Sequence, residues 1–223
     1  MDENGHEFVD LDLPSHVLWA TCNVGASSPW EYGLYFAWGE TKGYDRDQYH
    51  SFDWKNYKWC NGSEDSMSKY CTDPSYGIVD NKTVLDATDD AAIANWGGGW
   101  HMPTEQEMVE LIKYCKWKWK RNYKGSGVEG FEGTSKRNGA KIFLPANCYK
   151  DGSDIDWACY CGHYWVNSLL PSSEKNLAYK NLAYNIFIKD VGTSSTIYSA
   201  LSLRYLGFGI RPVRDLSSFS NKN

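Results

Sequence analysis

The chain has 223 residues, with 23 basic and 28 acidic side chains and a formal net charge of −5 at pH 7. This length is sufficient for one full hydrophobic core, so we expect a single domain over residues 1–223. A negative net charge offers no basic surface for nucleic acid, which is therefore not an expected partner. The mean hydropathy is −0.58 and no apolar run has the length of a membrane span, so no membrane insertion is expected.

Aromatic residues make up 16% of the chain, including 11 Trp and 16 Tyr. Trp and Tyr bury a large area and keep a polar group, so they suit loop-rich cores as well as binding surfaces. The sequence leaves both uses open for each ring.

The seven cysteines form an odd set, and no metal site or other cofactor is expected from them. No Cys-x-x-Cys pair and no histidine at zinc-finger spacing accompanies them. Cys60 and Cys71 flank a polar loop and are candidates for a disulfide. Cys159 and Cys161 would close a strained ring if bonded to each other, so separate partners or free thiols are expected.

The N-terminal part predicts two strands followed by irregular chain. Phe8–Leu13 nearly alternates between apolar and polar residues, and Val17–Cys22 follows it after a turn. Gly33–Gly39 is an apolar run bounded by glycines, consistent with a buried strand or an irregular core segment. From Glu40 to Asp86 no hydrophobic period persists, which predicts a long loop held by aromatic rings.

Two helices are predicted, and both carry N-terminal signals. The first is expected to be capped by Thr88, with Asp89 and Asp90 at the positive end of its dipole, and to end at Gly97–Gly99. The second begins at the capping box Thr104–Glu107. Its apolar face is expected to consist of Met108, Leu111, Ile112 and Cys115.

The remaining chain predicts short strands, and the fold class is therefore α+β. Asn138–Gly139 lies between two strand-like runs and predicts a hairpin with a type I′ turn. The predicted strands are Trp117–Lys120, Val128–Thr134, Lys141–Leu144, Gly162–Leu169, Leu182–Ile188, Thr196–Leu201 and Gly207–Val213.

Six motifs occur in order along the chain: Leu18–Ala26, Tyr35–Thr41, Trp96–Thr104, Phe143–Ala146, Tyr164–Trp165 and Gly207–Val213. They resemble the major paralogous domain proteins of gut bacteria and their phages. That family is similar to the formylglycine-generating-enzyme branch of the C-type lectin fold. The resemblance implies this fold, with two helices, short antiparallel strands and long loops. It also implies a place at a cell surface, outside the cell or on a phage particle.

Members of this branch also serve as variable proteins of diversity-generating retroelements, which rewrite the segment between the Tyr-Trp strand and the terminal Gly-Phe-x-x-Arg strand. The resemblance therefore implies a non-enzymatic protein that binds a protein or glycan on a cell surface through a variable region at residues 164–213. The candidate ligand-binding residues are Val166, Asn167, Ser168, Leu169, Leu170, Asn185, Tyr198, Leu201, Leu203 and Tyr205. The leucines among them suit an exposed apolar patch and inward-facing strand positions equally well.

Other functions remain open alternatives. A surface adhesin or glycan-binding module without diversification would use the same scaffold. The resemblance also implies, as an alternative, a cysteine oxidase. Cys159 and Cys161 lie closer together in sequence than the catalytic cysteine pair of that branch, which counts against this function. A calcium-dependent lectin would need a Glu-Pro-Asn, Gln-Pro-Asp or Trp-Asn-Asp triplet, and none occurs. No Gly-x-Ser-x-Gly motif or phosphate-binding loop is present, so no catalytic residue is predicted.

Overall fold

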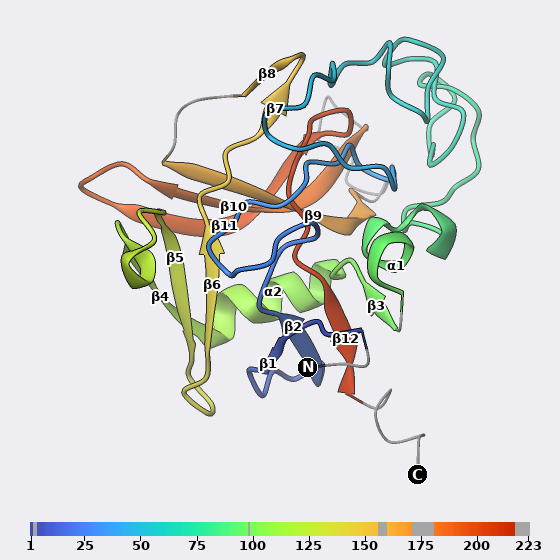
Figure 1. Ribbon diagram of the computed structural model, residues 1–223. Coiled ribbons are helices and arrows are strands. Elements are labelled where there is room, and N and C mark those ends of the chain that lie inside the picture. The colour runs from blue at the N-terminus through green and yellow to red at the C-terminus, as the bar shows by residue number, and fades with distance from the viewer. Residues whose placement is uncertain (2–3, 98, 156–159, 171–180, 217–223) are drawn as a thin grey trace.

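The computed structural model describes residues 1, 4–97, 99–155, 160–170 and 181–216 (Figure 1). Within these ranges the protein is a mixed α/β structure of short strands, two α-helices and long irregular segments. None of the helices described is long and apolar enough to span a membrane. The helices are η1 (Ala87–Asp89), α1 (Ala91–Trp96), α2 (Glu105–Tyr114) and η2 (Tyr123–Gly125). The strands are β1 (Phe8–Asp10), β2 (Val17–Ala20), β3 (Trp100–His101), β4 (Cys115–Lys120), β5 (Gly130–Ser135), β6 (Lys141–Pro145), β7 (Lys150–Asp151), β8 (Asp154–Ile155), β9 (Cys161–Leu169), β10 (Leu182–Asp190), β11 (Ser195–Leu203) and β12 (Val213–Asp215).

The described strands form three sheets and a hairpin, and every pairing between them is antiparallel. One sheet has the order β1-β2-β12-β3 and therefore joins the two ends of the chain. The other two have the orders β4-β5-β6 and β11-β10-β9, and β7 pairs with β8. Helix α2 lies below the β9–β11 sheet in Figure 1, while the β7–β8 hairpin lies above it.

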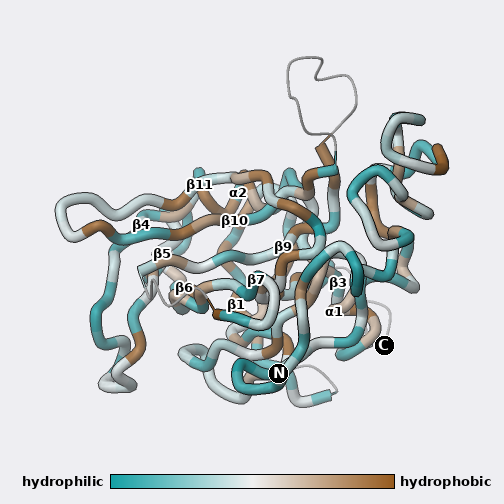
Figure 2. The backbone as a smooth tube through the Cα atoms, turned by 90° about the horizontal axis from the view of Figure 1, so that it is seen from above, coloured by the Kyte–Doolittle hydropathy of each residue, from teal (hydrophilic) through white to brown (hydrophobic). Residues whose placement is uncertain are grey.

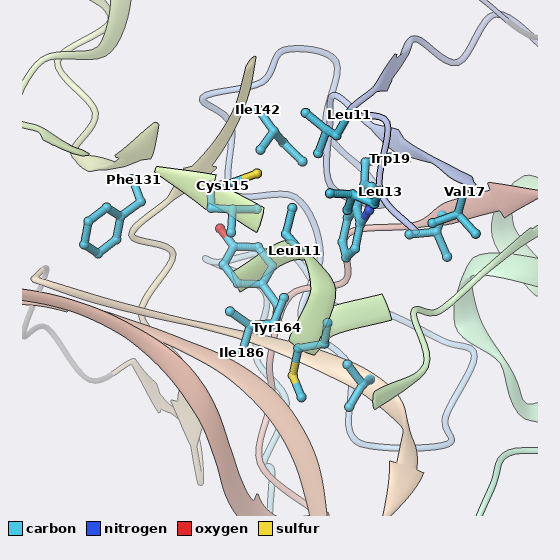
Figure 3. Close-up of a cluster of buried hydrophobic side chains, with 14 of the residues drawn as sticks. Leu11, Leu13, Val17, Trp19, Leu111, Cys115, Phe131, Ile142, Tyr164 and Ile186 are labelled. Carbon is cyan, nitrogen blue, oxygen red and sulfur yellow. The ribbon is translucent and has the colours of Figure 1, made fainter. Parts of the chain in front are cut away.

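The first hydrophobic core is shared by α2 and all three sheets (Figure 3). Helix α2 contributes Met108 and Leu111, and the β9–β11 sheet contributes Tyr164, Ile186 and Ile188. Because side chains alternate across a strand, these positions fix which face of β9 and β10 is turned toward the helix. The predicted amphipathic helix is confirmed, including its capping box, in which Glu107 N donates to Thr104 Oγ1 and Thr104 N donates to Glu107.

A second core lies on the other side of β9 and is built largely from irregular chain. The segment Gly33–Gly39 crosses it without forming a strand, so the irregular-core interpretation holds. Two indoles lock this segment to β9: Trp38 Nε1 donates to Val166 O at 2.8 Å and Trp165 Nε1 donates to Phe36 O at 2.8 Å. Trp38 and Trp165, whose use the composition left open, thus donate to backbone carbonyls of the neighbouring segment.

The predicted start of the first helix is wrong by two residues. Ala87–Asp89 forms the separate 3₁₀ turn η1, and the N-cap of α1 is Asp90, not Thr88. The Asp90 carboxylate accepts from Ala92 N and Ile93 N, and also from Met102 N at 2.9 Å. A carboxylate serves here because it accepts bonds from two chain segments at once, which the single hydroxyl of a threonine does less well.

Two turn predictions are also corrected. The β5–β6 hairpin is present, but only Gly139 of the Asn-Gly pair has a positive φ (77°), so the turn is not type I′. Its closing bond runs from Ser135 N to Ala140 O, which makes the loop longer than two residues. Of the predicted strand Gly207–Val213, only Val213 belongs to a strand, β12.

No disulfide joins Cys60 to Cys71, and none of the six cysteines within the described ranges takes part in a disulfide. The Cys60 thiol donates to Trp54 O and the Cys71 thiol donates to Asp73 O, so each is satisfied locally within the Glu40–Asp86 loop. The loop is instead held by buried rings such as Tyr57 and Tyr70. Cys159 lies outside the described residues.

A titrating pair connects β3 to α2. Burial by itself lowers the pKa of His101, but the Glu107 carboxylate, whose Oε1 lies 3.7 Å from His101 Nε2, outweighs it and raises this pKa above 6.5. Burial likewise raises the pKa of Glu107, but the ion pair with His101 and the bond from Thr104 N outweigh it and hold the pKa below 4.5. The protonated form of His101 and the ionised form of Glu107 therefore stabilise each other in the folded protein.

We expect the Glu107→Gln variant to be destabilised most between about pH 4.5 and 6.5. The His101 contribution is complete below its unfolded pKa and is lost as pH rises through its raised folded pKa. The Glu107 contribution is present above its unfolded pKa and is lost as pH falls through its lowered folded pKa. Urea unfolding of both proteins across this range measures the difference. Glutamine keeps the capping-box acceptor, so a difference that does not vary with pH would contradict the pairing.

Candidate functional site

A pocket of about 400 Å³ opens on the face of the β9–β11 sheet that points away from α2. Its walls come from the ends of β9, β10 and β11, from the β7 region and from the chain that follows β11. The lining residues are Tyr149, Asp151, Tyr160, Cys161, His163, Phe187, Lys189, Ser202, Leu203, Tyr205, Leu206 and Phe208.

Strand alternation places the pocket directly opposite the first core. Phe187 is paired with His163, and Lys189 is paired with Cys161, so these four side chains share one face. The even-numbered neighbours on β10, Ile186 and Ile188, point into the core with α2. The same strands therefore supply a rigid hydrophobic support on one side and a set of functional side chains on the other.

A chain of hydrogen bonds forms the polar floor of the pocket. Asn185 is fully buried, and its Nδ2 donates to Ala200 O at 3.2 Å and to Ser202 Oγ at 3.1 Å. Its Oδ1 lies 3.1 Å from His163 Nδ1. Because an amide oxygen can only accept, Nδ1 of His163 carries the proton of this hydrogen bond. The floor thus orients the imidazole through a buried partner.

The backbone of His163 is clamped by Asn147. His163 N donates to Asn147 Oδ1 at 2.9 Å, and Asn147 Nδ2 donates to His163 O at 3.2 Å. Gly209 N donates to the same carbonyl, and a Cβ at Gly209 would lie 2.3 Å from Asn147 Nδ2. This close approach explains why position 209 of the terminal motif is a glycine. The contact also holds the segment around Gly209 against the pocket.

Aromatic rings surround the imidazole. The centroids of Phe208, Phe187 and Tyr149 lie 4.4, 4.6 and 5.2 Å from that of His163. Tyr205 forms another wall and packs edge-on against Trp54 at 4.9 Å. Burial raises the pKa of Tyr205, and the negative charge of Asp151 raises it further, so this hydroxyl stays protonated at neutral pH.

The part of the pocket wall that follows β11 is held in place by the buried guanidinium group of Arg204. Arg204 is fully buried, and its guanidinium donates to Tyr70 O and to Asn181 Oδ1, each at 3.0 Å. Its backbone carbonyl accepts from Trp38 N. Tyr205 and Leu206, which come next, are thereby fixed at the pocket. The rim carries one exposed charge of each sign, Asp151 and Lys189.

The pocket is suited to noncovalent binding of a small or protruding ligand group. Apolar rings with a few oriented polar atoms are typical of ligand sites. Within the part of the chain that the structure describes, no group of three or more His, Cys, Asp or Glu side chains is arranged to hold a metal ion.

Only some of the predicted contact residues lie at this site. Leu203 and Tyr205 line the pocket, and Asn185 lies in its floor. Tyr198 is 48% exposed and its ring lies 5.1 Å from that of Phe187, so it extends the same face beyond the pocket.

The other predicted contacts lie at buried or half-buried positions outside the pocket lining. Val166 points into the core with α2, and Leu169 and Leu170 are also buried, at 3% and 5% exposure. Asn167 is nearly buried and its backbone bonds to Pro103 and Leu85. The remaining two, Ser168 and Leu201, are half-buried, but Ser168 donates to Asn167, and Leu201 pairs with Tyr184 on the α2 side of the sheet. These six side chains are occupied by the fold and do not form the pocket.

Sequence reasoning missed most of the pocket. The missed residues are Tyr149, Asp151, Tyr160, Cys161, His163, Phe187, Lys189, Ser202, Leu206 and Phe208. A signal existed in the period of two that links Cys161 with His163 and Phe187 with Lys189. That pattern does not say which of the two faces is covered.

Comparisons with known proteins give no further identification. No family model matches the chain, and no curated protein or solved structure matches it.

Proposed function

We propose that this protein is a non-enzymatic binding protein that presents its ligand contacts on a C-type-lectin-like scaffold. The observation that carries the proposal is the pocket on the face of β9–β11, with its ordered His163–Asn185–Ser202 floor and aromatic walls. The α+β architecture and the family motifs in register along the chain support the scaffold assignment. The ligand is a group displayed by a protein or glycan on a cell surface.

The proposal includes diversification by a retroelement. It is supported by the different roles of the two faces of the sheet. Residues on the pocket face can change without altering the core with α2 on the other face. Tyr198, Ser202, Leu203 and Tyr205 are the positions where change would reach the ligand directly. Sequencing the neighbouring DNA tests this part: a reverse transcriptase beside a near-copy of the 3′ end, differing mainly at adenines, is the expected arrangement.

A cysteine-based enzyme is the second candidate. The observation that favours it is the location of Cys161, whose thiol lines the same pocket as the His163 imidazole. A thiol beside an oriented imidazole is a recurring nucleophilic arrangement. The Cys161→Ser variant separates the two functions, because it would abolish thiol chemistry but leave binding through the aromatic walls nearly intact.

We expect Tyr205→Ala to weaken binding by about 2 kcal/mol, or roughly thirtyfold in Kd. Tyr205 is half-buried in the pocket wall, and tyrosines at such positions typically contribute a large share of the binding free energy of an interface. A glycan array and a random peptide library displayed on phage would supply the probe, and titration calorimetry would supply the Kd. The matched control is Tyr49→Ala, since Tyr49 is 83% exposed and lies outside the pocket lining. Equal affinities for the two variants would contradict a binding site at the pocket.

A further inference from the structure

Strand β11 is an open edge of its sheet. The order β11-β10-β9 leaves β11 with a strand on one side only, and Figure 2 shows it along the outer border of the sheet. It is nine residues long, and its sequence from Ser195 to Leu203 contains no charged residue and no proline. A long, uncharged edge is a template for pairing with another strand.

The hydrogen-bond pattern identifies the backbone groups on that edge. Val191 N donates to Ser194 O across the β10–β11 turn, and Asp190 N donates to Tyr160 O on the opposite side of β10. Because bonded pairs alternate along an antiparallel ladder, the even-numbered residues of β11 bond to β10. The odd-numbered residues direct their N–H and C=O groups outward. Within the described part of the chain, no backbone group bonds to these groups at Ser195, Ile197, Ser199 or Leu201.

The other long edge strands that the structure describes are protected. β4 carries Lys116, Lys118 and Lys120, and β6 ends at a proline, Pro145. The outer side of β9 is covered by short bridges to Val84, Cys148 and Gly209. Lysine, proline and covering chain are the usual means by which an edge is kept from pairing. Their absence from β11 distinguishes it from every other long edge strand that the structure describes.

We propose that β11 pairs antiparallel with β11 of a second copy of this chain, with Ser199 opposite Ser199 of that copy. Outward groups occur only at odd positions, so the register must place odd residues opposite odd residues. The register centred on Ser199 satisfies this condition and overlaps all nine residues.

The side chains fit this register. On the α2 side of the sheet, Ile197 lies opposite Leu201 of the second copy, so two half-buried apolar side chains meet. On the pocket side, Tyr198 lies opposite Ala200 and Thr196 lies opposite Ser202. Aromatic or β-branched residues opposite small ones are favourable cross-strand pairs, and no charge is opposed to another. This self-complementarity favours a second copy over an unrelated peptide as the occupant of the edge.

The pairing joins two three-stranded sheets into one of six strands. A two-fold axis normal to the sheet, midway between the two Ser199 residues, leaves both pocket faces on the same side. The dimer therefore presents two pockets to one surface, which raises the apparent affinity for a multivalent ligand through effective concentration. The dimer itself does not depend on what the pocket binds, so it stands or falls independently of the proposed function.

Light scattering coupled to size exclusion tests the proposal on the full chain. The expected mass is twice the 25.4 kDa of one chain. Ser199→Lys places two like charges side by side at the axis and should raise the dimer Kd at least about tenfold, whereas Thr193→Lys in the preceding turn should not. Ser199 is exposed in the single chain, so its replacement leaves the fold unchanged, and circular dichroism verifies this.

Oxidative cross-linking distinguishes this register from other contacts. The two Ser199 Cα atoms would lie about 5.5 Å apart, within disulfide reach, whereas the two Ser195 Cα atoms would lie about 26 Å apart. Ser199→Cys should therefore form a covalent dimer under mild oxidation, and Ser195→Cys should not. A monomer at the highest soluble concentration, a dimer insensitive to Ser199→Lys, or equal cross-linking of both cysteine variants would each overturn the proposal.

Discussion

The double variant Leu169→Ser/Leu170→Ser is expected to be unfolded at room temperature. Leu169 is buried in the second core with Trp165 and Phe208, and Leu170, which follows the end of β9, is also buried. Truncating one buried leucine costs about 2–5 kcal/mol, and the added hydroxyl finds no partner in an apolar site. Two such changes remove about as much free energy as a typical domain has in total. Far- and near-ultraviolet circular dichroism measure the loss.

The matched control is Leu201→Ser/Leu203→Ser. Both of these leucines are half-buried on β11, so we expect the pair to lower the free energy of unfolding by only about 1–2 kcal/mol. Leu203 also lines the pocket, which means that the control variant should lose ligand affinity while it remains folded. If both double variants unfold alike, or neither does, the assignment of one pair to the core and the other to the surface is wrong.

Arg211→Met is expected to lower the free energy of unfolding by about 3 kcal/mol or more. The Arg211 side chain is fully buried and donates to Asn23 Oδ1, Ala20 O and Phe143 O. Methionine fills much of the same volume but leaves all three acceptors without a donor inside the protein. Each orphaned buried acceptor costs about 1–3 kcal/mol.

This arginine connects the end of β2 to β6, so its loss should loosen two sheets together. The control is Arg137→Met, because Arg137 forms a half-exposed ion pair with Asp12 at 3.1 Å. Such surface pairs contribute about 0–1 kcal/mol. Urea unfolding monitored by tryptophan fluorescence gives the free energy of unfolding of both variants. Comparable losses in the two variants would show that the Arg211 bonds are not a main support of the fold.

Local patterns in the sequence were sufficient for elements whose signals involve near neighbours. The capping box at Thr104 and the helical spacing of Met108 and Leu111 predicted α2 correctly. The alternating segments from Gly162 onward predicted β9, β10 and β11 to within two residues at each end. These signals are reliable because a helix or strand is specified by contacts along one short segment.

Turns and caps depended on contacts from farther away. Asp90 replaces Thr88 as a cap because it also bonds to Met102, which belongs to a later segment. The Gly207–Val213 motif is not a strand because Gly209 is held against Asn147 and His163 instead of beside a continuous partner. Cys60 and Cys71 form no disulfide, and each thiol donates to a nearby carbonyl.

The sequence by itself determined the fold class, the amphipathic helix and the alternation of the three central strands, since these follow from side-chain periodicity. Only the tertiary structure decided which face of those strands is covered by α2 and which forms the pocket. Alternation is symmetric between two faces, so Val166 and His163 are equivalent until a helix packs against one of them. The same holds for β11: its uncharged sequence is visible in the chain, but its position at an open edge arises only when β10 pairs with β9 on the other side.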